Sequence, residues 1–283
     1  MKRNRMKVIK ETYKETKRSS LLVYMIVRFI VIVCMILELI RGDLNNALLC
    51  LLSLVLFILP FFIQQKFKIT LPSLLETIIL MFIFSAEILG EINNFYGLIP
   101  FWDTMLHTIN GFLAAAIGFS LVDLLNNNSK GIHLSPLYVS IVAFCFSMTI
   151  GVLWEFYEFG SDKFLKSDMQ KDRIVESISS VTFDPKKENN SIQYNDISYT
   201  ILYDQKNQEL LKINGYLDIG LIDTMKDLFV NFIGAIIFSF LGYFYLLNNQ
   251  KKSFIENFIT VKGNLELSNS LKEKFITKKK EKA

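Results

Sequence analysis

Six long apolar stretches dominate this sequence and limit what it can fold into. A helix needs roughly 20 residues to cross the hydrocarbon core of a bilayer, and each stretch is about that long. The chain is 51% hydrophobic, and its mean hydropathy of +0.33 is too high for an ordinary soluble domain. We therefore predict an all-α membrane protein with six transmembrane helices. Their approximate ranges are 20–40, 46–63, 72–90, 104–125, 135–159 and 221–247.

Basic residues gather before the first span and after the last, and Lys66 and Lys68 lie between spans two and three. The positive-inside rule assigns these segments to the cytoplasm. A net charge of +4 is too small to indicate a nucleic-acid partner, so the lipid bilayer is the expected partner and the oligomeric state stays open. The predicted organisation is a basic cytoplasmic leader at 1–19, helices one to five within 20–159, an extracytoplasmic loop domain at 160–220, helix six at 221–247 and a basic cytoplasmic tail at 248–283.

The loop between helices five and six is the one region with soluble character. Apolar and polar residues alternate from Ile192 to Tyr203, and a polar turn follows at 204–207. This pattern predicts a β-hairpin, while helical character is a further possibility at 171–180. We expect a small α/β or β-hairpin insertion that rests on the outer ends of the spans as a lid.

Ionisable side chains inside the spans are the strongest indication of a functional site. Each costs roughly 2.5–3.5 kcal/mol at the centre of an inserted helix, so its presence calls for a reason. Asp103 and His107 lie four residues apart at the start of span four and share one helical face. In the expected orientation, four such helix ends lie in the outer half of the membrane and surround an outward-facing polar cavity. Their polar residues are Glu87, Glu91, Asp103, His107, Asn110, Glu155, Glu158, Asp223, Asp227 and Asn231.

Small residues beside these positions predict close helix contacts. Gly111 on span four and Gly234 on span six leave no side chain between neighbouring backbones, which would let the polar faces converge. Arg28 in span one lies apart from this group. It is either an internal counter-ion or a residue whose long side chain reaches the membrane surface.

Clustered carboxylates with one imidazole suit a hard divalent cation such as Mg²⁺, Mn²⁺ or Ca²⁺ better than structural zinc. The candidate ligands are Asp103, His107, Glu155, Glu158, Asp223 and Asp227. Without a metal, Asp103 and His107 could form an acid/base pair in which the carboxylate orients the imidazole. The candidate catalytic set is Asp103, His107, Glu155 and Asp227, lined by Glu87, Asn110 and Asn231. Either arrangement suits hydrolysis or group transfer on a lipid-linked or cell-envelope substrate.

Other interpretations stay open at this point. The aromatic residues at the same helix ends fit an interfacial belt, and Asp103 and Asp223 could simply complement helix N-termini. A cation- or proton-coupled transporter would use the same residues, although the inner halves of spans four to six are apolar. A non-enzymatic envelope partner or sensor would use the outer loop. Whether the protein is an enzyme is therefore undecided.

Four motifs resemble the YjdF-like family of bacterial inner-membrane proteins of unknown function. They are WDTMLHTINGF from Trp102, WEFYE from Trp154, DMQKD from Asp168 and GYLDIGLIDTMKDLFVNFIGA from Gly215. The resemblance extends from about span three to the end of span six. It implies a multi-pass protein of the bacterial cell membrane and supplies no reaction.

A more distant resemblance links the chain to VanZ-like proteins, which are associated with teicoplanin resistance. In this sequence the chain departs from the VanZ-like pattern in its long outer loop and at Glu158, where those proteins often have a glutamine. The resemblance implies a role in the cell envelope. The matching positions are Asp103, His107, Glu155, Asp227, Asn231 and Gly234.

Overall fold

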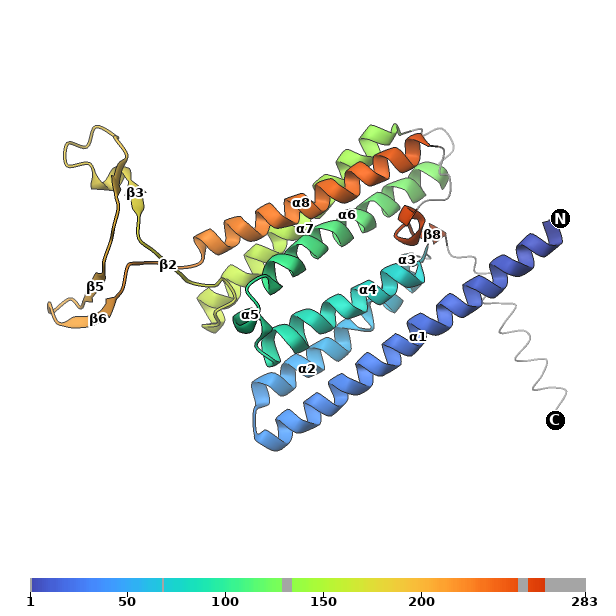
Figure 1. Cartoon of the computed structure of the whole chain (residues 1–283), viewed down its shortest axis with the longest axis horizontal. Helices are drawn as coiled ribbons and strands as arrows, with labels where there is room; N and C mark the ends of the chain where they lie inside the picture. The colour runs from blue at the N-terminus through green and yellow to red at the C-terminus, as the bar shows by residue number, and fades with distance from the viewer. Residues whose placement is uncertain (1, 68, 129–133, 249–253, 263–283) are drawn as a thin grey trace. The chain divides into compact units, whose positions relative to one another are not determined.

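The computed structural model describes residues 2–67, 69–128, 134–248 and 254–262 (Figure 1). Most of the predicted basic tail lies outside the described residues. The chain divides into two units. The first comprises Met1–Ile150 and Val230–Ala283, and the second comprises Gly151–Phe229.

Helices make up most of the first unit. Six helices of the described chain are long and apolar enough to cross a membrane, when α2 with α3 and α4 with η1 are each counted as one span. This confirms the predicted set of six. The helices are α1 (Lys2–Arg41), α2 (Leu44–Leu56), α3 (Leu59–Phe67), α4 (Ser73–Ile83), the π-helix η1 (Phe84–Ile92), α5 (Phe95–Leu98), α6 (Trp102–Asn128), α7 (Pro136–Leu165) and α8 (Leu221–Leu247), of which α7 and α8 continue into the second unit.

Two of the spans are interrupted, and the sequence explains one interruption directly. The second span breaks between α2 and α3, where Pro60 lies at the start of α3. Proline is tolerated in the first turn of a helix but cannot continue one, because it lacks an N–H and its ring clashes with the preceding turn. The third span changes from α4 to the wider η1 at Phe84. The Trp102 indole N–H donates to the Ser85 carbonyl of η1 at 3.2 Å.

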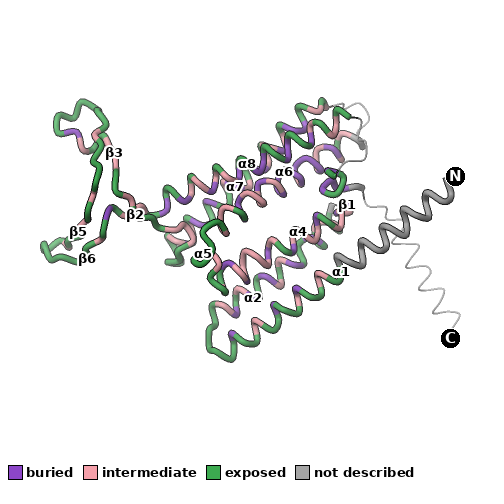
Figure 2. The backbone as a smooth tube through the Cα atoms, in the orientation of Figure 1, coloured by how far each residue is buried: buried purple, intermediate pink, exposed green. Residues whose placement is uncertain are grey.

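Helix α6 lies at the centre of the first unit, against α4 and η1. Half of the residues in the most apolar stretch of α6 are buried, whereas 17% are buried in the corresponding stretch of α1. Figure 2 shows the same contrast. The small side chains of Ala114, Ala115 and Ala116 are all buried, which allows neighbouring helices to approach closely. The position of α6 therefore decides where its polar first turns come to lie.

Part of the predicted tail belongs to the fold. After α8, the short 3₁₀-helix η3 (Phe254–Asn257) leads to β8 (Val261–Lys262), which pairs antiparallel with β1 (Ile69–Thr70). The ring of Phe258 packs edge-to-face against Phe112 and Phe238 at centroid distances of 5.2 and 6.4 Å. This segment extends the main apolar core formed by α4, α6, α7 and α8.

The second unit contains three antiparallel strand pairs. The hairpin of β5 (Thr200–Tyr203) and β6 (Glu209–Ile213) around Asp204 confirms the predicted one. The possible helical character at 171–180 was wrong, because β2 (Arg173–Val175) and β3 (Ile178–Ser180) occupy that range. Branched side chains at Ile174, Val175 and Ile178 favour extended backbone. Strand β2 pairs with β7 (Tyr216–Asp218), and β3 pairs with β4 (Ile192–Tyr194). The 3₁₀-helix η2 (Val181–Phe183) lies between β3 and β4 in the chain.

Asp184 organises the loop after η2 and gives a pH prediction. Its carboxylate accepts backbone N–H groups from Asn190, Lys186 and Glu188 at 3.1, 3.0 and 2.9 Å. The bond from Asn190 contributes most to lowering the pKa of Asp184 below its usual range. A lowered folded-state pKa stabilises the loop at neutral pH, and this stabilisation is lost as the pH falls through the lowered value.

We expect the backbone amide NMR signals of this loop to titrate below the ordinary range of aspartate in the full chain in detergent. The Asp184→Asn variant should lose that transition and weaken the protection of the same amides from hydrogen exchange. A titration midpoint at or above the ordinary aspartate range would contradict the assigned hydrogen bonds.

Candidate functional site

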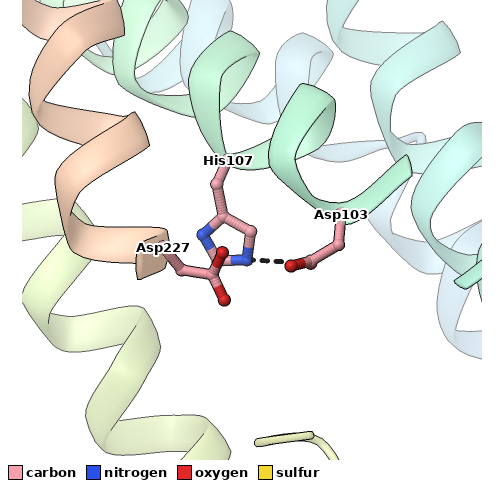
Figure 3. A group of neighbouring side chains, drawn as sticks. All are labelled: Asp103, His107 and Asp227. Carbon is pink, nitrogen blue, oxygen red and sulfur yellow. Dashed lines mark ion pairs between the residues drawn. The ribbon is translucent and has the colours of Figure 1, made fainter. Parts of the chain in front are cut away.

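The first two turns of α6 pair a carboxylate with an imidazole. Asp103 and His107 lie four residues apart, and Asp103 Oδ1 lies 3.4 Å from His107 Nε2 (Figure 3). His107 is buried, while Asp103 is partly exposed. A carboxylate in this position fixes the orientation of the ring and favours a proton on Nε2. The structure therefore brings together the two residues that the sequence predicted as an acid/base pair.

One turn further along α6, the backbones of α6 and α8 come into direct contact. A Cβ atom added to Gly111 would lie 2.1 Å from the Asn231 carbonyl oxygen, and one added to Gly234 would lie 2.1 Å from the Thr108 carbonyl oxygen. Only glycine fits at either position without a shift of the backbone. The close contact predicted from these glycines is confirmed.

Polar side chains lock this contact. Asn110 Nδ2 donates to Asn231 Oδ1 at 3.2 Å, and the Ser147 hydroxyl of α7 donates to the Gly111 carbonyl at 2.7 Å. Asn231 is almost completely buried, where an unpaired amide would cost about 1–3 kcal/mol. Asn110 and Asn231, predicted only as lining residues, thus fix α6 against α8 close to Asp103 and His107.

The helix α8 is continuous from Leu221 to Leu247, and its first turns carry two further acids. Asp227 lies one turn before Asn231 on the same face of the helix, and Asp223 lies one turn before Asp227. Both carboxylates are buried. The Lys226 ammonium lies 3.9 Å from Asp227 Oδ1, which offsets part of the charge on that carboxylate.

Within the second unit, Asp223 is engaged by the loop that contains the DMQKD motif. Its Oδ2 accepts the Lys171 backbone N–H at 2.9 Å, and its Oδ1 accepts from Arg173 Nη2 at 3.1 Å. These contacts occupy both oxygens of a carboxylate that the sequence placed among the metal ligands. The structure therefore gives Asp223 the role of tying the loop to α8.

Asp162 of α7 binds the same motif from another helix. Its two oxygens accept the backbone N–H groups of Met169 and Gln170 at 2.7 and 2.8 Å. Sequence reasoning did not find this clamp, although Asp162 precedes the motif by only a few residues. Three consecutive backbone N–H groups, from Met169 to Lys171, are thus bound by carboxylates of α7 and α8.

The remaining predicted acids lie on α7 and η1. Glu158 accepts the Trp154 indole N–H at 2.7 Å, a contact within α7 that satisfies a buried carboxylate and the indole together. Glu155 lies on the same helix and is also buried. Glu87 is half-buried on η1, the π-helix that packs against α6.

Comparison with known sequences assigns a family to the chain. The family described as a predicted membrane protein (DUF2238) matches residues 21–182, which include all of α6, all of α7 and the whole DMQKD motif. The chain belongs to the DUF2238 family. The matched range of DUF2238 ends before α8, so Asp227 and Asn231 lie outside it. The YjdF-like resemblance is consistent with this membership, and the VanZ-like resemblance stays a prediction.

One relative of this DUF2238 chain is an uncharacterized protein of Thermotoga maritima. It is 30% identical over 102 residues, which make up 36% of this chain and 51% of the relative. The chain therefore matches about half the length of that relative. No solved structure matches the chain.

Proposed function

We propose that Asp103, His107 and Asp227 form a divalent-cation site at one end of the helix bundle, acting on a lipid-linked or cell-envelope substrate. The observation that carries the proposal is the Asp103–His107 pair at the start of α6, next to the Asn110–Asn231 bond that holds α8. Figure 3 draws all three side chains, each of which offers one ligand atom.

The direction of the helices supports the inclusion of Asp227. The residue numbers of the contacts between α6 and α8 rise on both helices, since Gly111 contacts Asn231 and Phe119 contacts Gly242 further along. The two helices therefore run parallel. Because α8 is continuous, a step of one turn back from Asn231 reaches Asp227, as a step of one turn back from Gly111 reaches His107.

The donor set fits the cation proposed. Two carboxylates and one imidazole suit a hard divalent cation such as Mg²⁺ or Mn²⁺, and the set lacks the thiolates that are typical of structural zinc sites. An ion held there would polarise a phosphoryl or carbonyl oxygen. Asp103 orients the imidazole, and a histidine such as His107 is the kind of group that moves a proton near neutral pH.

Membrane orientation is part of the proposal. We place this end of the bundle at the outer face, with both termini in the cytoplasm of a bacterial cell, on the distribution of basic residues. The substrate would then reach the site from the outer leaflet. Transport is not included, because aromatic side chains such as Phe119 and Phe238 fill the interior between α6 and α8 further along.

A metal-binding measurement tests the site. Purified full-length protein should bind about one Mn²⁺ per chain, measured by calorimetry and by elemental analysis after dialysis. Asp103→Ala and Asp227→Ala should each weaken binding by about 10–100-fold, since a ligand is lost. Glu176→Ala removes an exposed carboxylate of the outer loop and should leave binding unchanged. Equal Mn²⁺ affinity in all four proteins would refute the site.

A further inference from the structure

A second site lies in the first unit, among α1, α3 and α4. The structure contains a cavity of about 690 Å³ lined by residues of these helices, by the break between α2 and α3, by residues 70–72 and by Asn257 of η3. This is within the size range of cavities that bind small molecules. Its lining residues include none of those in the proposed cation site.

The broken second span helps to form this cavity. Phe57 and Ile58, at the interruption, and Pro60, at the start of α3, all line it. Ile58 and Phe61 are exposed apolar residues in the lining. The cavity is therefore continuous with the surface that faces lipid.

Arg28 supplies a permanent positive charge to the cavity wall. It lies about two turns inside the first apolar span, where an isolated charge is costly. Its guanidinium donates to the Tyr24 hydroxyl, one turn nearer the start of the span, and lies 5.6 Å from the Tyr24 ring centroid. This geometry directs the guanidinium toward the start of the span, which is the nearer membrane surface.

We propose that this cavity binds one membrane phospholipid, with its phosphate on Arg28 and an acyl chain along the apolar wall at Ile58 and Phe61. A guanidinium presents paired N–H donors that match two phosphate oxygens. Basic pockets between membrane helices are a general mode of lipid headgroup binding. The mixed lining, charged at one end and apolar where it meets lipid, matches an amphiphile better than a free anion.

Glu76 selects among headgroups. Arg28 and Glu76 are the two charged residues among the described residues of the lining, and their formal charges are opposite. A zwitterionic headgroup with a primary ammonium matches this balance, whereas an anionic headgroup leaves Glu76 facing a negative charge. Phosphatidylethanolamine should therefore bind more tightly than phosphatidylglycerol, and Glu76→Gln should reduce the difference.

Native mass spectrometry of the delipidated full chain tests the site. One phosphatidylethanolamine should bind per chain, and diacylglycerol, which lacks the phosphate, should bind at least tenfold more weakly. Arg28→Gln should lower phospholipid occupancy about tenfold. Arg41→Gln is the matched control, because Arg41 lies on the same helix and pairs with Glu38 outside the cavity. Its occupancy should equal that of the wild type.

A second variant keeps the test independent of any folding defect in Arg28→Gln. Gln65 is an exposed residue of the lining, so Gln65→Trp should fill the entrance while Arg28 stays in place, and phospholipid occupancy should fall. Wild-type occupancy in both Arg28→Gln and Gln65→Trp would overturn the proposal. Equal binding of diacylglycerol and phosphatidylethanolamine would also overturn it, because the phosphate would then make no contribution.

Discussion

Replacing Phe258 with alanine should lower the free energy of unfolding by about 3–5 kcal/mol, the usual cost of removing a buried aromatic ring. Phe258 is only 3% exposed. Its ring contacts Phe112 of α6 and Phe238 of α8 edge-to-face, and such aromatic pairs add about 0.5–1.5 kcal/mol beyond the area they bury. The loss would leave a cavity in a core that α6 and α8 share.

Phe254 provides the matched control for this substitution. It lies on the same segment and contacts Phe258, but it is 63% exposed. Phe254→Ala should therefore cost much less. Unfolding of both variants by denaturant or heat in the same detergent, followed by circular dichroism, measures the difference. Equal stability of Phe258→Ala and the wild type would mean that the segment after α8 does not pack into the bundle.

The spans could be predicted because their signal is local and strong. Each needs only an apolar stretch of sufficient length, and the approximate ranges agree with the helices observed. The break before Pro60 also has a local cause, although hydropathy averaged over the whole span does not reveal it. The hairpin at 200–213 was predictable because alternation and a polar turn lie next to each other in the sequence.

Other features depend on contacts between distant residues and leave little trace in the sequence. In the sequence, the segment of the π-helix that begins at Phe84 is indistinguishable from an ordinary apolar α-helix. The packing of Phe258 could not be anticipated, because a short apolar run after a lysine pair resembles part of a basic tail. The pairing of β2 with β7 joins residues about forty positions apart, and sequence alternation does not specify such partners.

The positions of the candidate site residues were predicted in part for the same reasons. Asp103 and His107 share a helical face by their spacing alone, so their pairing followed from the sequence. Asp223 has the same spacing from Asp227, yet its oxygens bind Lys171 and Arg173 of the loop. Spacing identifies which side chains share a face, but the contacts of each carboxylate depend on what packs against that face.

Substituting leucine for Gly234 should prevent stable folding or cost at least about 3 kcal/mol, which is at the upper end of overpacking penalties. A Cβ atom at this position would lie 2.1 Å from the Thr108 carbonyl oxygen and 2.9 Å from the Phe112 nitrogen. Both neighbours are backbone atoms of α6. They cannot turn aside as a flexible side chain can, so α8 must move away from α6.

Gly160→Leu is the matched control, because nothing lies within 4 Å of a Cβ added at Gly160 on α7. That variant should fold and melt like the wild type, while Gly234→Leu should aggregate or melt at a lower temperature in size-exclusion and thermal assays. The smaller change Gly234→Ala allows Mn²⁺ affinity to be measured as well. If it folds, the displaced α8 should weaken the Asn110–Asn231 bond and lower Mn²⁺ affinity, because Asp227 lies on the same helix. Wild-type melting of Gly234→Leu would show that α6 and α8 do not meet at this glycine.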